Sequence, residues 1–257
     1  MHPITRVARP LAAAFVVLHL AGCASPEVRT LPAPETPTSS SPATTPADAP
    51  EPSVEETGPT TARTTARASG PVTVHDGPDG TPAGELPATT GFGSATTLLV
   101  VDASVDGWLE VVLPVRPNGT TGWVRTDGLE LREVTTEVRI DLDARQLEIV
   151  EDGEVTRRTT VAVGDAEHPT PTGTFSVTDK VASDDPYGPY GPFAIGLSGR
   201  SEVLTEFAGG DGQIAIHGTD RPDLLGEAVS HGCIRVHDEV ATWLAENLPL
   251  GTPVTVS

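Results

Sequence analysis

The most regular pattern in the chain is an alternation of hydrophobic and polar residues in its C-terminal half. Residues 138–142 and 146–150 alternate with a period of two, which places successive side chains on opposite faces of a strand. Asp152-Gly153 then favours a tight turn into a further strand within 155–163. Four more short segments are expected to be strands: 174–178, 193–197, 213–217 and 253–256. The pattern predicts a mostly β domain over residues 135–257.

One short helix is expected in this domain. Val240, Trp243 and Leu244 are spaced i, i+3 and i+4, which places them on one helical face. Asp238 precedes them and is a suitable N-cap residue, so the helix is predicted to run from about residue 238 to about residue 247.

Residues 71–133 show shorter apolar runs separated by turn dipeptides such as Asn118-Gly119, which predicts a small antiparallel β domain. Its Gly-Trp pairs, which contain Trp108 and Trp123, resemble those of the bacterial SH3-like barrel, and some other small β domain is the alternative. Both tryptophans are expected in its core, because large aromatic side chains supply much of the buried area of a small domain. Wall or peptide binding would be the function of such a unit.

The first 70 residues contain no apolar periodicity after an initial hydrophobic run. Arg6 and Arg9 precede the apolar residues 11–20, which is the order of an export signal and is too short to span a bilayer. Leu20-Ala21-Gly22-Cys23 resembles a bacterial lipobox, in which the cysteine carries the lipid. Residues 1–23 are therefore predicted to be a lipoprotein signal peptide, with an ordinary cleaved signal as the alternative.

Residues 24–70 are rich in Pro, Thr, Ser and Ala and are predicted to be a disordered tether. The chain would then be anchored to the membrane through Cys23, on the outer face of the cytoplasmic membrane or in the cell wall. A net charge of −20 disfavours nucleic acid as a partner, because its field repels phosphates.

The candidate chemistry lies at the end of a predicted strand and in the loop that follows it. If Cys23 carries lipid, Cys233 is the only other cysteine and has no disulfide partner within the chain. A thiol needs a nearby base to react at neutral pH, and His217 is the candidate. The carbonyl of Gly218 can orient the imidazole, and Gly232 leaves the backbone beside the thiol open, so that the amides of residues 232 and 233 form a candidate oxyanion hole.

Three sequence blocks resemble the signature of the L,D-transpeptidase catalytic domain (YkuD-type) over residues 135–257. They are Pro169-Thr170-Pro171-Thr172-Gly173-Thr174-Phe175, Ile216-His217-Gly218-Thr219 and Ser230-His231-Gly232-Cys233-Ile234-Arg235. The resemblance implies a β-sandwich that transfers acyl groups between peptidoglycan stem peptides, with Cys233 as nucleophile and His217 as general base and acid. The product would be a 3→3 cross-link, with release of the terminal D-alanine. Neither a metal nor an organic cofactor is implied.

The remaining residues of these blocks are expected to orient the site or to position substrate. Ser230 is a candidate for hydrogen bonds within the loop, His231 for shaping the substrate channel, and Arg235 for pairing with a stem carboxylate or a structural acid. The loop 187–192 faces the substrate or is packed as an ordinary loop.

Several other functions stay open at this point. Water as the acceptor would make the chain an L,D-carboxypeptidase, and a protein acceptor would make it a protein-to-peptidoglycan attachment enzyme. A non-catalytic wall-binding lipoprotein is a further alternative. A zinc site built from His217, His231, Cys233 and His237 is disfavoured, because no second cysteine is available and the spacing fits no familiar zinc motif.

Overall fold

The computed structural model describes residues 62–207 and 209–257. The predicted signal peptide, the lipidation site Cys23 and most of the predicted tether lie outside the described residues. Among the described residues no helix is long and apolar enough to cross a membrane.

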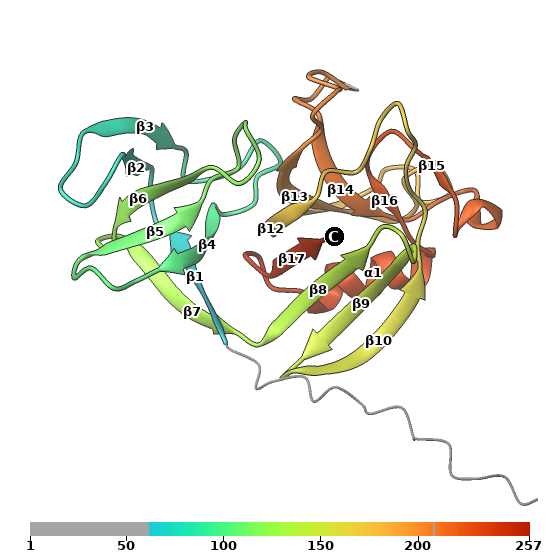
Figure 1. Cartoon of the computed structure of the whole chain (residues 1–257), viewed down its shortest axis with the longest axis horizontal. Coiled ribbons are helices and arrows are strands. Elements are labelled where there is room, and N and C mark those ends of the chain that lie inside the picture. Colours follow the sequence, from blue (N-terminus) through green and yellow to red (C-terminus); the bar gives the residue numbers. More distant parts are fainter. Residues whose placement is uncertain (1–61, 208) are drawn as a thin grey trace, which may run out of the picture. The chain divides into compact units, whose positions relative to one another are not determined.

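Residues 63–134 form a seven-stranded antiparallel sheet with the strand order β3-β2-β6-β5-β4-β1-β7 (Figure 1). Its strands are β1 (Arg63–Ala68), β2 (Val72–His75), β3 (Pro82–Leu86), β4 (Thr97–Asp102), β5 (Trp108–Val112), β6 (Thr121–Arg125) and β7 (Leu129–Val134). Trp108 is buried as predicted, with the His75 ring edge-on against it and the Arg125 guanidinium over its face. Trp123 is only half-buried, because it lies on the more exposed face of β6.

Strand β1 corrects the predicted extent of the tether, which was expected to continue to residue 70. β1 pairs with β4 on one side and β7 on the other, and Thr65 and Ala66 are buried between them. Its Thr- and Ala-rich sequence resembles the tether in composition. Partner strands far along the chain satisfy its backbone hydrogen bonds, so the segment is ordered despite its weak apolar pattern.

Residues 136–256 form an eight-stranded sheet with the order β10-β9-β8-β17-β12-β13-β14-β16. Its strands are β8 (Thr136–Asp141), β9 (Gln146–Glu151), β10 (Glu154–Thr160), β12 (Gly173–Ala182), β13 (Phe193–Arg200), β14 (Gln213–His217), β16 (Ile234–Arg235) and β17 (Pro253–Val256). A small parallel pair, β11 (Val163–Gly164) and β15 (Ala228–Ser230), accompanies it, with a 3-10 turn at Pro222–Leu224 and the helix α1 (Asp238–Asn247). The prediction of a mostly β fold with one short helix is confirmed.

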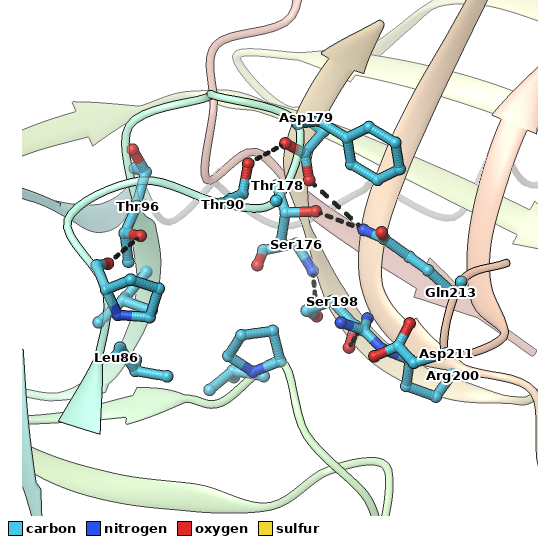
Figure 2. Close-up of a pocket in the computed structure, with 18 of the residues that line it drawn as sticks. Leu86, Thr90, Thr96, Ser176, Thr178, Asp179, Ser198, Arg200, Asp211 and Gln213 are labelled. Atoms are coloured by element: carbon cyan, nitrogen blue, oxygen red, sulfur yellow. Dashed lines mark hydrogen bonds and ion pairs between the residues drawn. The ribbon is translucent and has the colours of Figure 1, made fainter. Parts of the chain in front are cut away.

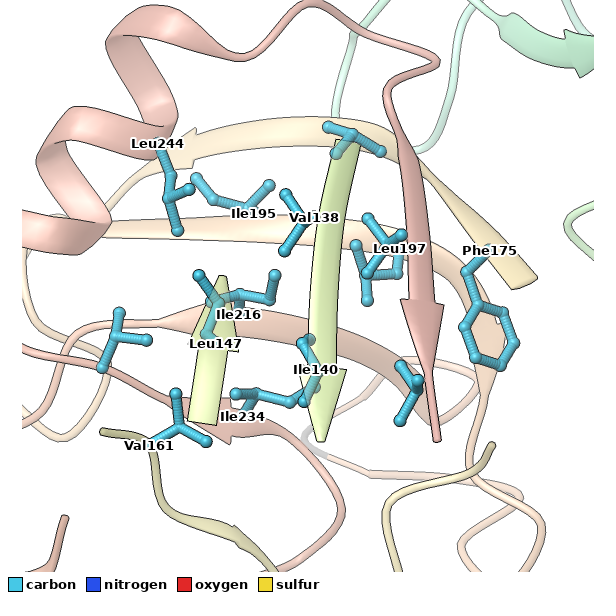
Figure 3. Packing of buried hydrophobic residues seen from close by; sticks show 14 of the residues in the cluster. Val138, Ile140, Leu147, Val161, Phe175, Ile195, Leu197, Ile216, Ile234 and Leu244 are labelled. Atoms are coloured by element: carbon cyan, nitrogen blue, oxygen red, sulfur yellow. The ribbon is translucent and has the colours of Figure 1, made fainter. Parts of the chain in front are cut away.

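The core of this sheet is built from the alternating residues that predicted its strands. Ile140 and Leu147 come from β8 and β9, and their side chains pack with Ile195 and Ile216 from β13 and β14 (Figure 3). Leu244 of α1 closes the same core. Because strands from both halves of the sheet contribute to one cluster, the sheet curves around its apolar face, and β14 and β16 lie at one edge of it.

Helix α1 spans the predicted residues, but its N-cap residue differs from the prediction. Asp238 is its first residue, His237 holds the N-cap position, and no side chain caps the helix. The Asp238 carboxylate instead accepts a hydrogen bond from the Thr219 amide at 2.9 Å, which supports the loop after β14. The prediction that Asp238 is the N-cap residue is therefore wrong, because a tertiary contact uses its carboxylate.

Replacing Leu147 with alanine is expected to lower the free energy of unfolding by about 2 to 5 kcal/mol, since Leu147 is fully buried and cavity formation adds to the lost transfer free energy. Urea denaturation followed by circular dichroism measures the change. The matched control is Leu131→Ala, because Leu131 is 48% exposed and its replacement is expected to change stability by less than about 0.5 kcal/mol. Equal effects of the two substitutions would contradict the packing described here.

Candidate active site

One cavity of about 270 Å³ brings most of the predicted site residues together. Cys233, His217, Ser230, His231 and Arg235 all line it. Their positions follow from the parallel pairing of β14 with β16, in which Ile216 is opposite Ile234 and His217 is opposite Arg235. The loop before β16 therefore brings the thiol to the strand that ends in the imidazole. We refer to this space as the Cys233 cavity.

The imidazole of His217 is held in one orientation and is neutral at physiological pH. Its side chain is buried, and Nδ1 lies 2.6 Å from the Gly218 carbonyl, the contact predicted from the sequence. A carbonyl oxygen can only accept, so Nδ1 carries the proton and Nε2 is left as a proton acceptor. Burial lowers the pKa of His217 to about 4, the Gly218 hydrogen bond opposes this shift, and the charge of Arg235 adds to it.

The thiol of Cys233 is protonated at rest. The residue is only partly exposed to the cavity. Burial of the sulfur disfavours the charged thiolate and so raises the pKa of the thiol. A hydrogen bond from the Ala215 backbone and the charge of Arg235 oppose this effect to a smaller extent. The resting pair is therefore a thiol and a neutral imidazole, and a thiolate forms only when the proton is transferred.

A network of hydrogen bonds fixes the loop that carries Cys233. The Ser230 hydroxyl donates to the Cys233 carbonyl at 2.5 Å and accepts from the Gly232 amide at 3.1 Å. Gly232 has a φ of 111°, a conformation that glycine adopts without strain. The Gly232 amide is thus already engaged, which corrects the expectation that it serves as an oxyanion donor; the Cys233 amide remains the candidate.

Thr170 supports the same loop from the first sequence block. Its buried hydroxyl donates to the Gly232 carbonyl at 2.9 Å and accepts from the Gly164 amide at 2.9 Å. Sequence reasoning used this block only as part of a family signature. In the fold, Thr170 of this block contacts the cysteine loop directly.

Two glycines allow the histidine loop to pack closely. A Cβ added to Gly218 would lie 2.3 Å from the Asp238 carboxylate and 2.9 Å from the Cα of Gly191. Gly191 belongs to the loop 187–192, whose Tyr190 ring lies 4.8 Å from the His217 ring, centroid to centroid. Pro189 and Tyr190 of this loop line the cavity, whereas Tyr187 is 88% exposed.

Arg235 and His231 are two of the polar residues that line the cavity. The Nε atom of Arg235 is buried without a hydrogen-bond partner, and no ion pair of Arg235 occurs among residues 62–207 and 209–257. The expected alternative of a structural acid is therefore not seen in that part of the chain. The exposed His231 ring lies 5.0 Å from the His168 ring and 5.7 Å from Phe207, a residue that sequence reasoning missed.

The zinc alternative gains no support from the geometry. Within the described part of the chain no three His, Cys, Asp or Glu side chains lie close enough together to hold a metal ion.

A second cavity, of about 460 Å³, lies between the seven-stranded and eight-stranded sheets (Figure 2). Its wall includes the buried Asp179, whose carboxylate accepts a hydrogen bond from Thr90 and lies beside Gln213. None of the predicted site residues lines this cavity. Gln213 lines both cavities, so they adjoin at the start of β14.

Comparison with known proteins agrees with the motifs that line the Cys233 cavity. Residues 135–256 match the family described as the L,D-transpeptidase catalytic domain, YkuD. The chain is 32% identical over 131 residues to the putative L,D-transpeptidase YqjB of Bacillus subtilis, a match that covers 47% of this chain and 70% of YqjB. It is also 32% identical over 120 residues to the putative L,D-transpeptidase YkuD of the same organism.

The matches to the curated relatives cover less than half of this chain. The YkuD match of Bacillus subtilis covers 47% of this chain and 65% of that relative, so the chain spans slightly less than two thirds of its length. Among solved structures, an L,D-transpeptidase from Mycobacterium smegmatis has 20% sequence identity and a TM-score of 0.40, with 72% of this chain and 99% of that chain covered.

Proposed function

Because the chain belongs to the L,D-transpeptidase family, a family of cysteine transpeptidases, we propose that it forms 3→3 cross-links between peptidoglycan stem peptides with Cys233 as its nucleophile. The observation that carries this proposal is that Cys233 shares one cavity with a histidine whose Nε2 is unprotonated. The lowered pKa keeps His217 neutral at physiological pH, so Nε2 has a free lone pair for the thiol proton.

In the first step, Nε2 of His217 takes the proton from the Cys233 thiol while Sγ attacks the carbonyl carbon of the third stem residue. The Cys233 amide is the candidate donor to the oxyanion. The carbon–nitrogen bond to the terminal D-alanine then breaks, and His217 returns the proton to the leaving amine. The product is a thioester on Cys233 and free D-alanine.

In the second step, the side-chain amine of a second stem attacks the thioester carbonyl. His217 takes a proton from this amine and delivers it to the departing sulfur, which restores the thiol. Arg235 is positioned to pair with a stem carboxylate, since its buried Nε has no partner in the described part of the chain. Neither step requires a metal or an organic cofactor.

Incubation of the full chain with a disaccharide tetrapeptide, followed by mass spectrometry, tests this proposal. The expected product is a dimer of two stems that has lost one D-alanine and contains a 3→3 bond on fragmentation. Tripeptide without dimer would instead identify water as the acceptor and a carboxypeptidase. Unchanged tetrapeptide would overturn the proposal of an active enzyme.

We also propose that the enzyme acts outside the cytoplasm, held to the membrane by lipid on Cys23, with the seven-stranded sheet as an SH3-like unit beside the catalytic domain. The lipobox resemblance and the substrate class support this location. Replacing Cys23 with alanine is expected to move the protein from the membrane fraction to the soluble fraction. Equal membrane retention of both forms would contradict lipid anchoring.

A further inference from the structure

The loop between β13 and β14, described for residues 201–207 and 209–212, forms one wall of the Cys233 cavity. Ser201, Leu204, Phe207 and Gly212 line the cavity, and the next strand, β14, ends at His217. The position of this loop therefore influences the shape of the space in which a stem peptide would bind.

One side chain of the seven-stranded sheet holds this loop at three points. Arg116 lies in the turn between β5 and β6, and its Nη2 donates to three backbone carbonyls of the loop. The distances are 2.9 Å to Ser201, 3.1 Å to Leu204 and 2.8 Å to Asp211. Because these carbonyls come from both ends of the loop, a single guanidinium fixes how the loop closes.

Asn118, in the same turn, holds the strand end at which the loop starts. Its Nδ2 donates to the Arg200 carbonyl at 2.8 Å, and its Oδ1 accepts from the Arg200 amide at 2.8 Å. A side-chain amide thus forms the two hydrogen bonds that a neighbouring strand would form. Asn118 therefore holds the last residue of β13, and Arg116 holds both ends of the loop that follows.

The backbone of the loop is shaped around the guanidinium. The Ser201 amide donates to the Gly212 carbonyl at 2.8 Å, which closes the base of the loop. Gly212 has a φ of 75°, and a Cβ there would lie 2.0 Å from the Leu204 carbonyl oxygen and 3.0 Å from Nη2 of Arg116. Glycine is therefore required where the loop, its own carbonyl and Arg116 meet.

We infer that Arg116 and Asn118 are positioning residues for the acylation of Cys233, and that the seven-stranded sheet completes the catalytic cavity by fixing its β13–β14 wall. This inference rests on the proposed function. It assigns the turn between β5 and β6 a part in catalysis in addition to any binding of the cell wall by the rest of that sheet.

The test compares Arg116→Met with Arg125→Met in the full chain. Arg125 also carries one positive charge in the seven-stranded sheet, but it contacts Trp108 and Asp79 of the same sheet, so its replacement is a matched control. The rate of acylation of Cys233 by a carbapenem is followed by intact mass and peptide mapping. We expect Arg116→Met to reduce this rate by about 10- to 100-fold, because small displacements of a positioning wall have effects of that order.

Two further variants and one stability measurement separate a positioning role from an effect on stability. Arg116→Lys is expected to recover part of the acylation rate, because its ammonium can still donate to the carbonyls. Asn118→Ala is expected to lower the acylation rate although Arg116 is still present. Thermal unfolding of each variant shows whether the fold is retained. A wild-type acylation rate in folded Arg116→Met and Asn118→Ala would overturn the inference.

Alkylation of Cys233 by iodoacetamide distinguishes failure of this inference from failure of the proposed function. Peptide mapping reports Cys233 separately from Cys23. If the wild-type chain is not acylated by the carbapenem, the proposed function fails. The positioning role of Arg116 is tested separately, because it predicts that the alkylation rate of Cys233 changes several-fold in Arg116→Met and stays unchanged in Arg125→Met. Equal alkylation rates in these two variants would refute the inference by itself.

Discussion

Replacing Cys233 with serine is expected to reduce cross-link formation from a tetrapeptide donor by at least about 10³-fold, the scale seen when a catalytic nucleophile is removed. A serine hydroxyl is a much weaker acid than a thiol. Its proton is therefore transferred to His217 far less readily than the proton of the thiol. Liquid chromatography with mass spectrometry of the muropeptide products measures the change.

The fold is expected to survive this substitution. The hydrogen bond from Ser230 reaches the backbone carbonyl of residue 233 and not its side chain, so the loop keeps its support. Cys23→Ser in the same chain is the matched control, since it removes the other cysteine and is expected to leave catalysis in solution unchanged. Substantial cross-linking by folded Cys233→Ser would show that another residue is the nucleophile.

Replacing His217 with asparagine is expected to lower the rate of Cys233 acylation by about 10²- to 10⁴-fold, the usual contribution of a positioned general base. Asparagine keeps a polar group near the Gly218 carbonyl but cannot accept the thiol proton. The acylation rate with a carbapenem, measured by stopped-flow absorbance, gives the effect. His237→Asn is the control, because His237 is exposed at the start of α1 and does not line the cavity.

The pH dependence of the wild-type reaction provides a second test of the same base. The imidazole must be neutral to accept a proton, and its lowered pKa keeps it neutral down to about pH 4. The acid limb of the rate profile is therefore expected near pH 4, whereas a histidine with an ordinary pKa would give a limb near 6.5. A limb near 6.5 in folded protein would contradict the buried, neutral imidazole.

Protein stability has to be followed in that experiment. The unfolded chain protonates His217 at its ordinary pKa of 6.5 and the folded chain only near 4, so this group lowers stability as the pH falls through that interval. Circular dichroism at each pH separates loss of the base from loss of the fold.

The sequence predicted the strands around the core most successfully where burial is one-sided. Ile140 and Leu147 lie in segments that alternate cleanly, and both are fully buried in the structure. β1 was missed because its small side chains give no apolar signal, and its order depends on β4 and β7. Local composition contains no information about such distant partners.

The candidate site was predictable in its chemistry but not in its supports. Cys233 and His217 stand in short motifs, and the Gly218 carbonyl is adjacent in sequence, so their grouping could be proposed from the chain alone. Tyr190, Thr170 and Arg116 reach the cavity or its walls from distant segments, and no local pattern links them to the cysteine. The engaged Gly232 amide likewise depends on the rotamer of Ser230, which the sequence does not determine.

The most direct test of the account is to isolate the acyl-enzyme. The full chain is incubated with a tetrapeptide donor in the absence of acceptor, quenched in acid and mapped by mass spectrometry. The peptide containing Cys233 is expected to gain the mass of the donor acyl group without its D-alanine, through a bond that hydroxylamine cleaves. An acyl group on another residue, or turnover with Cys233 never modified, would contradict it.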